Sequence, residues 1–168
     1  MNIDEAKEVY DSLLIELSVL NYDRKGIAKY DRNAKNEDCF KMDLVYFLLY
    51  LSQTDGEVST AGVDYIKDFF NDAFVDRIID EKPYLGRVMS EIPLSFVTVV
   101  DKHVYDLTFN MEGMFYSVLW EKYLALLGYL GMGVATADNM TQMENQTLLD
   151  YLKMLRDYAE FRTHKKTD

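Results

Sequence analysis

Acidic side chains occupy two short turns, each of which separates an apolar helical run from a second helix. The first turn carries Asp55 and Glu57, and the second carries Asp138 followed by Glu144 at the start of the next helix. Carboxylate oxygens are the ligands that Ca²⁺ and Mg²⁺ prefer in proteins. If the two turns lie together, these four residues form a candidate divalent-cation site. Neither turn has the acid spacing of an EF-hand loop.

A second interpretation of the same residues requires no ion. The Asp side chains serve to close turns. Glu144 follows Thr141 at the spacing of a capping box, in which each side chain bonds the backbone N–H of the other residue. At the level of the sequence both interpretations stay open.

The other reactive side chains are few. Cys39 is the only cysteine, and His103 and His164 are the only histidines. A Cys–His pair is arithmetically possible, but no further residue supports it, so a structural cysteine is the favoured interpretation. His103 with Asp101 and Asp106 lacks the second and third soft ligands of a zinc site. We therefore expect no catalytic residues and no enzymatic activity.

The segment GYLGMG, residues 128–133, superficially suggests a nucleotide-binding loop. It lacks the preceding strand and the Gly-Lys-Ser/Thr that such loops need. The favoured interpretation is that Gly128, Gly131 and Gly133 let two helices approach closely, with a helix of the first repeat as the neighbour.

Apolar periodicity predicts an all-α protein, a single domain spanning residues 1–168 and built from about seven helices. A polar connection over 21–37 follows the first helix. The run at 38–53 is apolar on nearly all sides, which is typical of a central helix. Ser59 is the expected N-cap of the third helix. The other helices are expected at about 4–20, 73–81, 93–110, 112–133 and 141–162.

Two segments of the chain resemble one another. Aligning Asp55 with Asp138 predicts two pseudo-symmetric helix–turn–helix repeats, over about 40–82 and 112–160. Gly and Asn, the residues best suited to a left-handed turn, then coincide. Gly56 aligns with Asn139 directly. Once one residue is removed after the first turn, the further matched pairs are Ser59 with Thr141, Ile66 with Leu148, and Phe70 with Leu152.

These motifs resemble the TerB-like helical family of tellurite-resistance proteins. TDGEVS at 54–59 and ADNMTQME at 137–144 match its helix–turn–helix signature in two halves, and EIPLSF at 91–96 is similar to its middle helix. The resemblance covers about residues 40–160. It implies a stress-related binding module with a metal-associated acidic surface. The family's Glu after the first Ser is absent, because Thr60–Gly62 fills that place.

Composition narrows the function further. The 168 residues carry 29 acids against 18 bases, a net charge of −11. This balance argues against nucleic-acid or anionic-membrane binding, which needs clustered Lys and Arg. The single cysteine favours a reducing, cytoplasmic setting. No signal peptide and no apolar run long enough to span a membrane is visible.

Three functions remain. The leading prediction is a cytoplasmic adaptor that binds a protein partner, with a divalent cation at the acidic turns. The alternative is a small acidic inhibitor or immunity protein that blocks a basic toxin or nuclease. A hydrolase using Asp55 and Asp138 is a third, weaker option. The sequence names neither the partner nor the oligomeric state.

Overall fold

The computed structural model describes residues 1–19, 35–54, 59–81, 119–137 and 139–164, with side chains as far as residue 160. Within these ranges the chain forms six helices and no strand, which confirms the all-α prediction. The predicted helix at 93–110 lies outside them. The helices are α1 (Ile3–Ser18), α2 (Asn36–Leu51), α3 (Thr60–Phe70), α4 (Ala73–Glu81), α6 (Leu119–Thr136) and α7 (Gln142–His164).

Local signals set most of the helix boundaries. α3 begins behind Ser59, whose Oγ accepts a hydrogen bond of 3.0 Å from the Gly62 N–H, as predicted. α3 ends at Asn71, which takes the left-handed conformation (φ 43°). The helix predicted to stop at residue 133 runs on to Thr136, because Gly133 lies inside it and does not terminate it.

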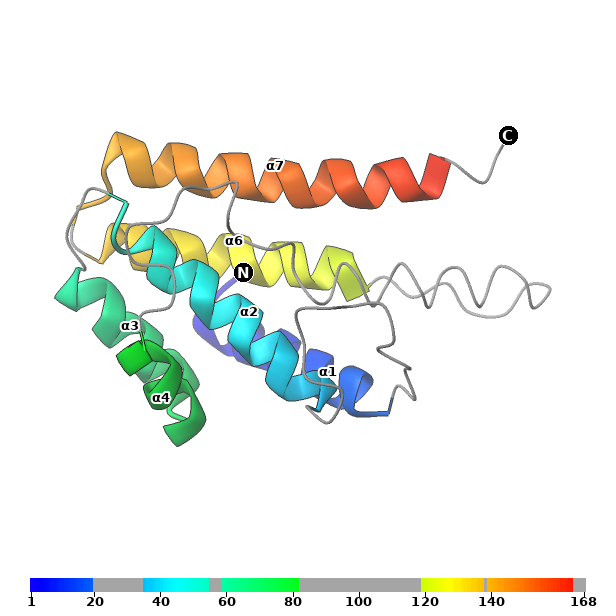
Figure 1. Cartoon of the computed structure of the whole chain (residues 1–168), viewed down its shortest axis with the longest axis horizontal. Helices are drawn as coiled ribbons and strands as arrows, with labels where there is room; N and C mark the ends of the chain where they lie inside the picture. Colours follow the sequence, from blue (N-terminus) through cyan, green and yellow to red (C-terminus); the bar gives the residue numbers. More distant parts are fainter. Residues whose placement is uncertain (20–34, 55–58, 82–118, 138, 165–168) are drawn as a thin grey trace.

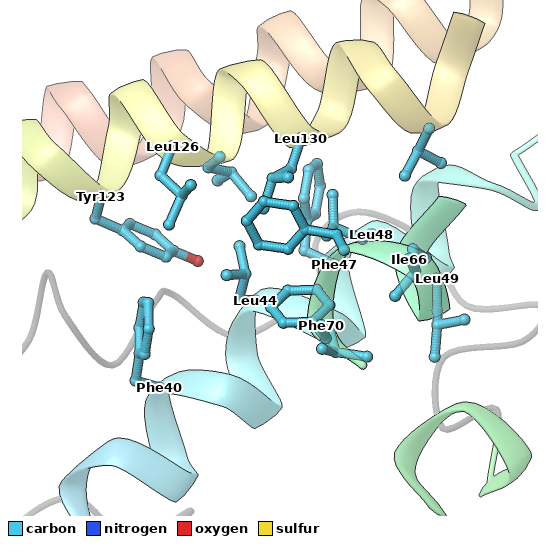
Figure 2. Close-up of a cluster of buried hydrophobic side chains, with 14 of the residues drawn as sticks. Phe40, Leu44, Phe47, Leu48, Leu49, Ile66, Phe70, Tyr123, Leu126 and Leu130 are labelled. Atoms are coloured by element: carbon cyan, nitrogen blue, oxygen red, sulfur yellow. The ribbon is translucent and has the colours of Figure 1, made fainter. Parts of the chain in front are cut away.

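The apolar helix α2 is central, as its sequence predicts. It packs against α1, α3, α4, α6 and α7. Figure 2 shows the resulting core, in which side chains from α2, α3 and α6 converge on one another. Phe40, Leu44 and Leu48 of α2 are fully buried there, together with Ile66 of α3. Burial of this apolar surface is the main force that holds the helices together.

Stacked and edge-on rings fasten the outer helices to this core. Tyr10 of α1 packs against Phe70 with ring centroids 5.3 Å apart, and also against Phe69 and Phe40. Burial raises the pKa of Tyr10, and nearby acids add to the shift. On the other side Tyr151 of α7 stacks on Phe47 of α2 at 3.8 Å. Each ring pair contributes stability beyond its buried area.

The helices form two hairpins with two covering helices (Figure 1). α6 and α7 lie side by side along most of their length, and α2 and α3 form the other hairpin. α4 packs on both α2 and α3, while α1 packs on α2 and α6. An ion pair between Glu16 and Lys122 joins α1 to α6. α3 packs along α6 more extensively than α7 packs on α2, so the twofold relation of the repeats stays a prediction.

Candidate functional site

The turn between α6 and α7 uses its described carboxylate as a helix cap. Oε2 of Glu144 accepts hydrogen bonds from the Thr141 backbone N–H at 2.7 Å and the Thr141 hydroxyl at 3.0 Å. In return the Glu144 N–H donates to Oγ1 of Thr141 at 3.1 Å. The Glu144 side chain is 2% exposed. The predicted capping box is confirmed, and an ion at Glu144 would have to compete with it.

The turn between α2 and α3 is closed without a described carboxylate. The Ser59 N–H donates to the carbonyl of Ser52 at 2.8 Å, and the Ser52 hydroxyl donates to the carbonyl of Leu49 at 2.9 Å. A Cβ on Gly62 would lie 3.1 Å from Cβ of Ser52, so this glycine lets α3 approach the end of α2. The hydroxyl cap at Ser59 has no reciprocal Glu, as the sequence predicts.

The structure brings together none of the four predicted metal ligands as a set. Asp55, Glu57 and Asp138 lie outside the described residues, and only Glu144 is placed. Within the described ranges no cluster of three or more His, Cys, Asp or Glu side chains is arranged to hold a metal ion. The divalent-cation site therefore stays a prediction.

The predicted structural role of Cys39 agrees with its position. Its thiol is fully buried in α2, where a substrate in solvent cannot reach it. His103, Asp101 and Asp106 lie outside the described residues, and the side chain of His164 does too.

The glycine segment 128–133 is helical and lies within α6, so it is a packing surface and not a nucleotide loop. Gly133 faces the ring of Tyr65 in α3, as predicted for a neighbour from the first repeat. Gly131 and Gly128 instead face Leu148 and Leu152 of α7. Burial raises the pKa of Tyr65, and a hydrogen bond with Tyr129 adds to the shift.

One charged contact was not visible in the sequence. Lys41 of α2 forms a 2.8 Å ion pair with Asp72, which also caps α4 by accepting the Phe74 N–H at 2.8 Å. The Lys41 hydrogen bond, and then the Phe74 N–H, lower the pKa of Asp72. Lys41 and Arg77 both lie over the Phe74 ring. This contact holds α4 against α2, and its geometry suggests a structural role only.

The sequence also did not predict a groove along the outer side of α6 and α7. It has a volume of about 350 Å³, and its walls combine apolar side chains with one acid and one base. The sequence feature that could have indicated the groove is the spacing of its lining residues, which recur three or four positions apart on both helices. The lining residues are Trp120, Glu121, Leu124, Ala125, Leu152 and Arg156.

Exposed methionines flank the second turn. Met140 precedes the Thr141 cap and Met143 lies in the first turn of α7, where it is 57% exposed. Exposed single apolar residues are common, but two of them three positions apart at a helix start form a small adaptable contact surface. We call Met140 and Met143 the elbow surface.

Comparison with protein-family models, with curated proteins and with solved structures finds no match for this chain. The resemblance to TerB-like proteins therefore rests on the sequence motifs alone. Among the helices of the described ranges, none has the length and apolar character required to cross a membrane.

Proposed function

We propose that this chain is a cytoplasmic, non-enzymatic adaptor of the TerB-like type that binds a protein partner through the elbow surface. The observation that carries the proposal is the exposure of Met140 and Met143 beside a helix start closed by a capping box. Methionine is enriched at protein interfaces because its flexible thioether fits varied partners. The capping box holds this surface in one orientation before a partner arrives, which reduces the entropy lost on binding.

Affinity capture from extracts of the native host tests this surface. The variant carries Met140→Glu and Met143→Glu; glutamate near a helix N-terminus suits the helix dipole, so folding is retained. Ile15→Glu on α1, where Ile15 is 66% exposed, is the matched control. We expect a partner that the wild type and the control capture and the double variant loses. A partner retained by all three proteins would exclude the elbow surface.

The alternative function, inhibition of a basic toxin or nuclease, is favoured by the net charge of −11. Binding between oppositely charged proteins weakens as salt screens the charges, mainly through slower association. A single basic partner whose association rate falls steeply from about 0.05 to about 0.5 M salt supports the inhibitor. A partner bound equally at both concentrations supports the adaptor.

The metal part of the proposal depends on Asp55, Glu57 and Asp138, because the carboxylate of Glu144 is already bonded within its cap. Calorimetric titration of the protein with Ca²⁺, Mg²⁺ and Zn²⁺ tests it. No binding tighter than about 1 mM, the weak end of protein calcium sites, removes metal ions from the proposed function.

A further inference from the structure

The groove on the outer side of the α6–α7 hairpin lies between two regularly spaced stripes of residues. Glu121 and Ala125 of α6 and Leu152 and Arg156 of α7 line the groove. At the same helical spacing the α6 stripe continues to Gly128 and Met132, and the α7 stripe runs back to Leu149 and Asn145. Residues three and four apart lie on one face of a helix, so each set forms a continuous stripe. This repeat is the one that packed helices use for knobs-into-holes contacts.

Contacts between the two helices fix how the stripes are aligned. A Cβ on Gly128 would lie 3.6 Å from Cδ1 of Leu152, so the middle of one stripe adjoins the middle of the other. Glu121 and Arg156 therefore stand at the same end of the groove, on opposite walls. Neither forms an ion pair with the other or with another residue of the described ranges.

The stripes differ in size as well as in charge. The α6 stripe has the small residues Ala125 and Gly128 at its centre, with Trp120 and Leu124 beside it in the groove wall, whereas the α7 stripe has Leu149 and Leu152. Leu149 is 52% exposed and Met132 is 41% exposed. Large residues on one wall and small residues on the other are complementary when one wall faces the other across an interface.

We infer that this groove is the interface of a homodimer. A twofold axis parallel to α6 and α7 lays α6 of one copy along α7 of the other, so that neighbouring helices are antiparallel. Glu121 then faces Arg156 of the partner subunit, and the reverse pair forms at the same level. Leu152 enters the space over Ala125 and Gly128, and Met132 meets Leu149. The result is a four-helix bundle of the ordinary antiparallel type.

The charges of Glu121 and Arg156 favour a twofold axis parallel to the helices over one perpendicular to them. An axis perpendicular to the helices would lay α6 on α6, placing Glu121 against Met132 and leaving both charges without a counterpart. Unpaired charges at an interface oppose association, whereas opposite charges fix the register. The dimer inference is independent of the elbow surface, because Met143 lies on another side of α7 from Leu149 and Leu152.

Sedimentation equilibrium of the whole chain tests the dimer. Runs cover about 1 µM to about 1 mM, which includes weak and standard interfaces. Because each copy carries −11, the buffer holds about 0.15 M salt, where the Debye length is about 8 Å. We expect wild-type dimer that dissociates on dilution. Leu149 is exposed, so Leu149→Glu should not disturb the fold. It should raise the dissociation constant at least tenfold, which is the order of magnitude expected when an interface contact is lost. Ile15→Glu should leave it unchanged.

Charge reversal provides the decisive comparison. Glu121→Arg and Arg156→Glu should each weaken the dimer, because like charges then face one another. The double variant restores opposite charges and should restore the wild-type dissociation constant. Circular dichroism checks that each variant keeps its helices. A wild-type monomer at every concentration overturns the inference, as does a dimer that tolerates Leu149→Glu or is not rescued by the double variant.

Discussion

The two hairpins differ in whether their outer groove is filled. In the register that aligns Asp55 with Asp138, Val45 and Leu49 of α2 correspond to Gly128 and Met132 of α6. Val45 and Leu49 are buried, and α4 packs on both helices of that hairpin with Val75, Ile78 and Ile79. Gly128 is half-buried and Met132 is exposed. The same kind of hairpin is therefore a core element where a helix covers it, and it keeps an open groove where no helix of the described ranges lies.

The helices that follow the two turns, α3 and α7, differ in the number of hydrogen bonds that cap them. Ser59 receives one side-chain cap bond, whereas Thr141 and Glu144 exchange bonds in both directions. Among the helices of the described ranges, α7, which has the stronger cap, packs mainly on α6 and α2, whereas α3 packs on α2, α4 and α6. A helix start that other helices cover less depends more on its local hydrogen bonds.

Loss of the aligned aromatic residues gives the largest expected effect. The register pairs Phe69 with Tyr151, and each is buried against a different ring, Tyr10 or Phe47. Phe69→Ala and Tyr151→Ala should each lower the free energy of unfolding by about 3–5 kcal/mol. Urea denaturation followed by circular dichroism measures it. A loss below about 1 kcal/mol for Tyr151→Ala would show that the stack does not anchor α7.

Alanine at the glycines of α6 tests how tightly each side of this helix is packed. A Cβ on Gly131 would lie 2.5 Å from Cδ1 of buried Leu148, so Gly131→Ala should cost about 1–2 kcal/mol. Gly128 has only an ordinary contact with Leu152, so Gly128→Ala should stabilise the helix by about 0.5–1 kcal/mol. Thermal unfolding at low protein concentration measures both. Equal changes in stability for Gly131→Ala and Gly128→Ala would show that the two sides of α6 do not differ in how tightly they are packed.

Replacing the cap residues Ser59 and Thr141 with alanine compares the two helix starts directly. Thr141→Ala removes the hydroxyl that donates to Oε2 of Glu144 and accepts from the Glu144 N–H, so it should cost about 1–2 kcal/mol. Ser59→Ala removes one cap bond and should cost about 0.5–1 kcal/mol. Urea denaturation of both variants measures the difference. A larger loss for Ser59→Ala would reverse the ranking of the two caps.

The smallest expected effect concerns the ion pair that holds α4 on the first hairpin. Because the folded pKa of Asp72 is lowered, its stabilisation is present at neutral pH and is lost as the pH falls below about 4. Asp72→Asn keeps the cap but removes the charge, so it should cost about 0–1 kcal/mol at pH 7 and nothing at low pH. Unfolding measured from pH 7 downward tests this. Lys41→Met should show the same pH dependence.

Local features were predictable because their causes lie within one or two helical turns. The helix at 73–81, the Ser59 cap and the Thr141–Glu144 capping box follow from short patterns, and the structure confirms them. The Lys41–Asp72 contact was not predictable, because it joins residues 31 positions apart through the packing of α4 on α2. The candidate metal residues Asp55, Glu57 and Asp138 remain predictions from the sequence.

The sequence by itself determined the helical class, the central place of α2 and the acidic charge, because periodicity and composition act directly on burial and solvation. Only the tertiary structure decided which helical faces are covered. Gly131 and Gly128 lie three positions apart, yet Gly131 is closed by buried Leu148, whereas Gly128 has only an ordinary contact with Leu152, which lines the open groove. The physical reason is that coverage depends on where α4, α1 and α7 pack, and packing joins residues that are distant in the chain.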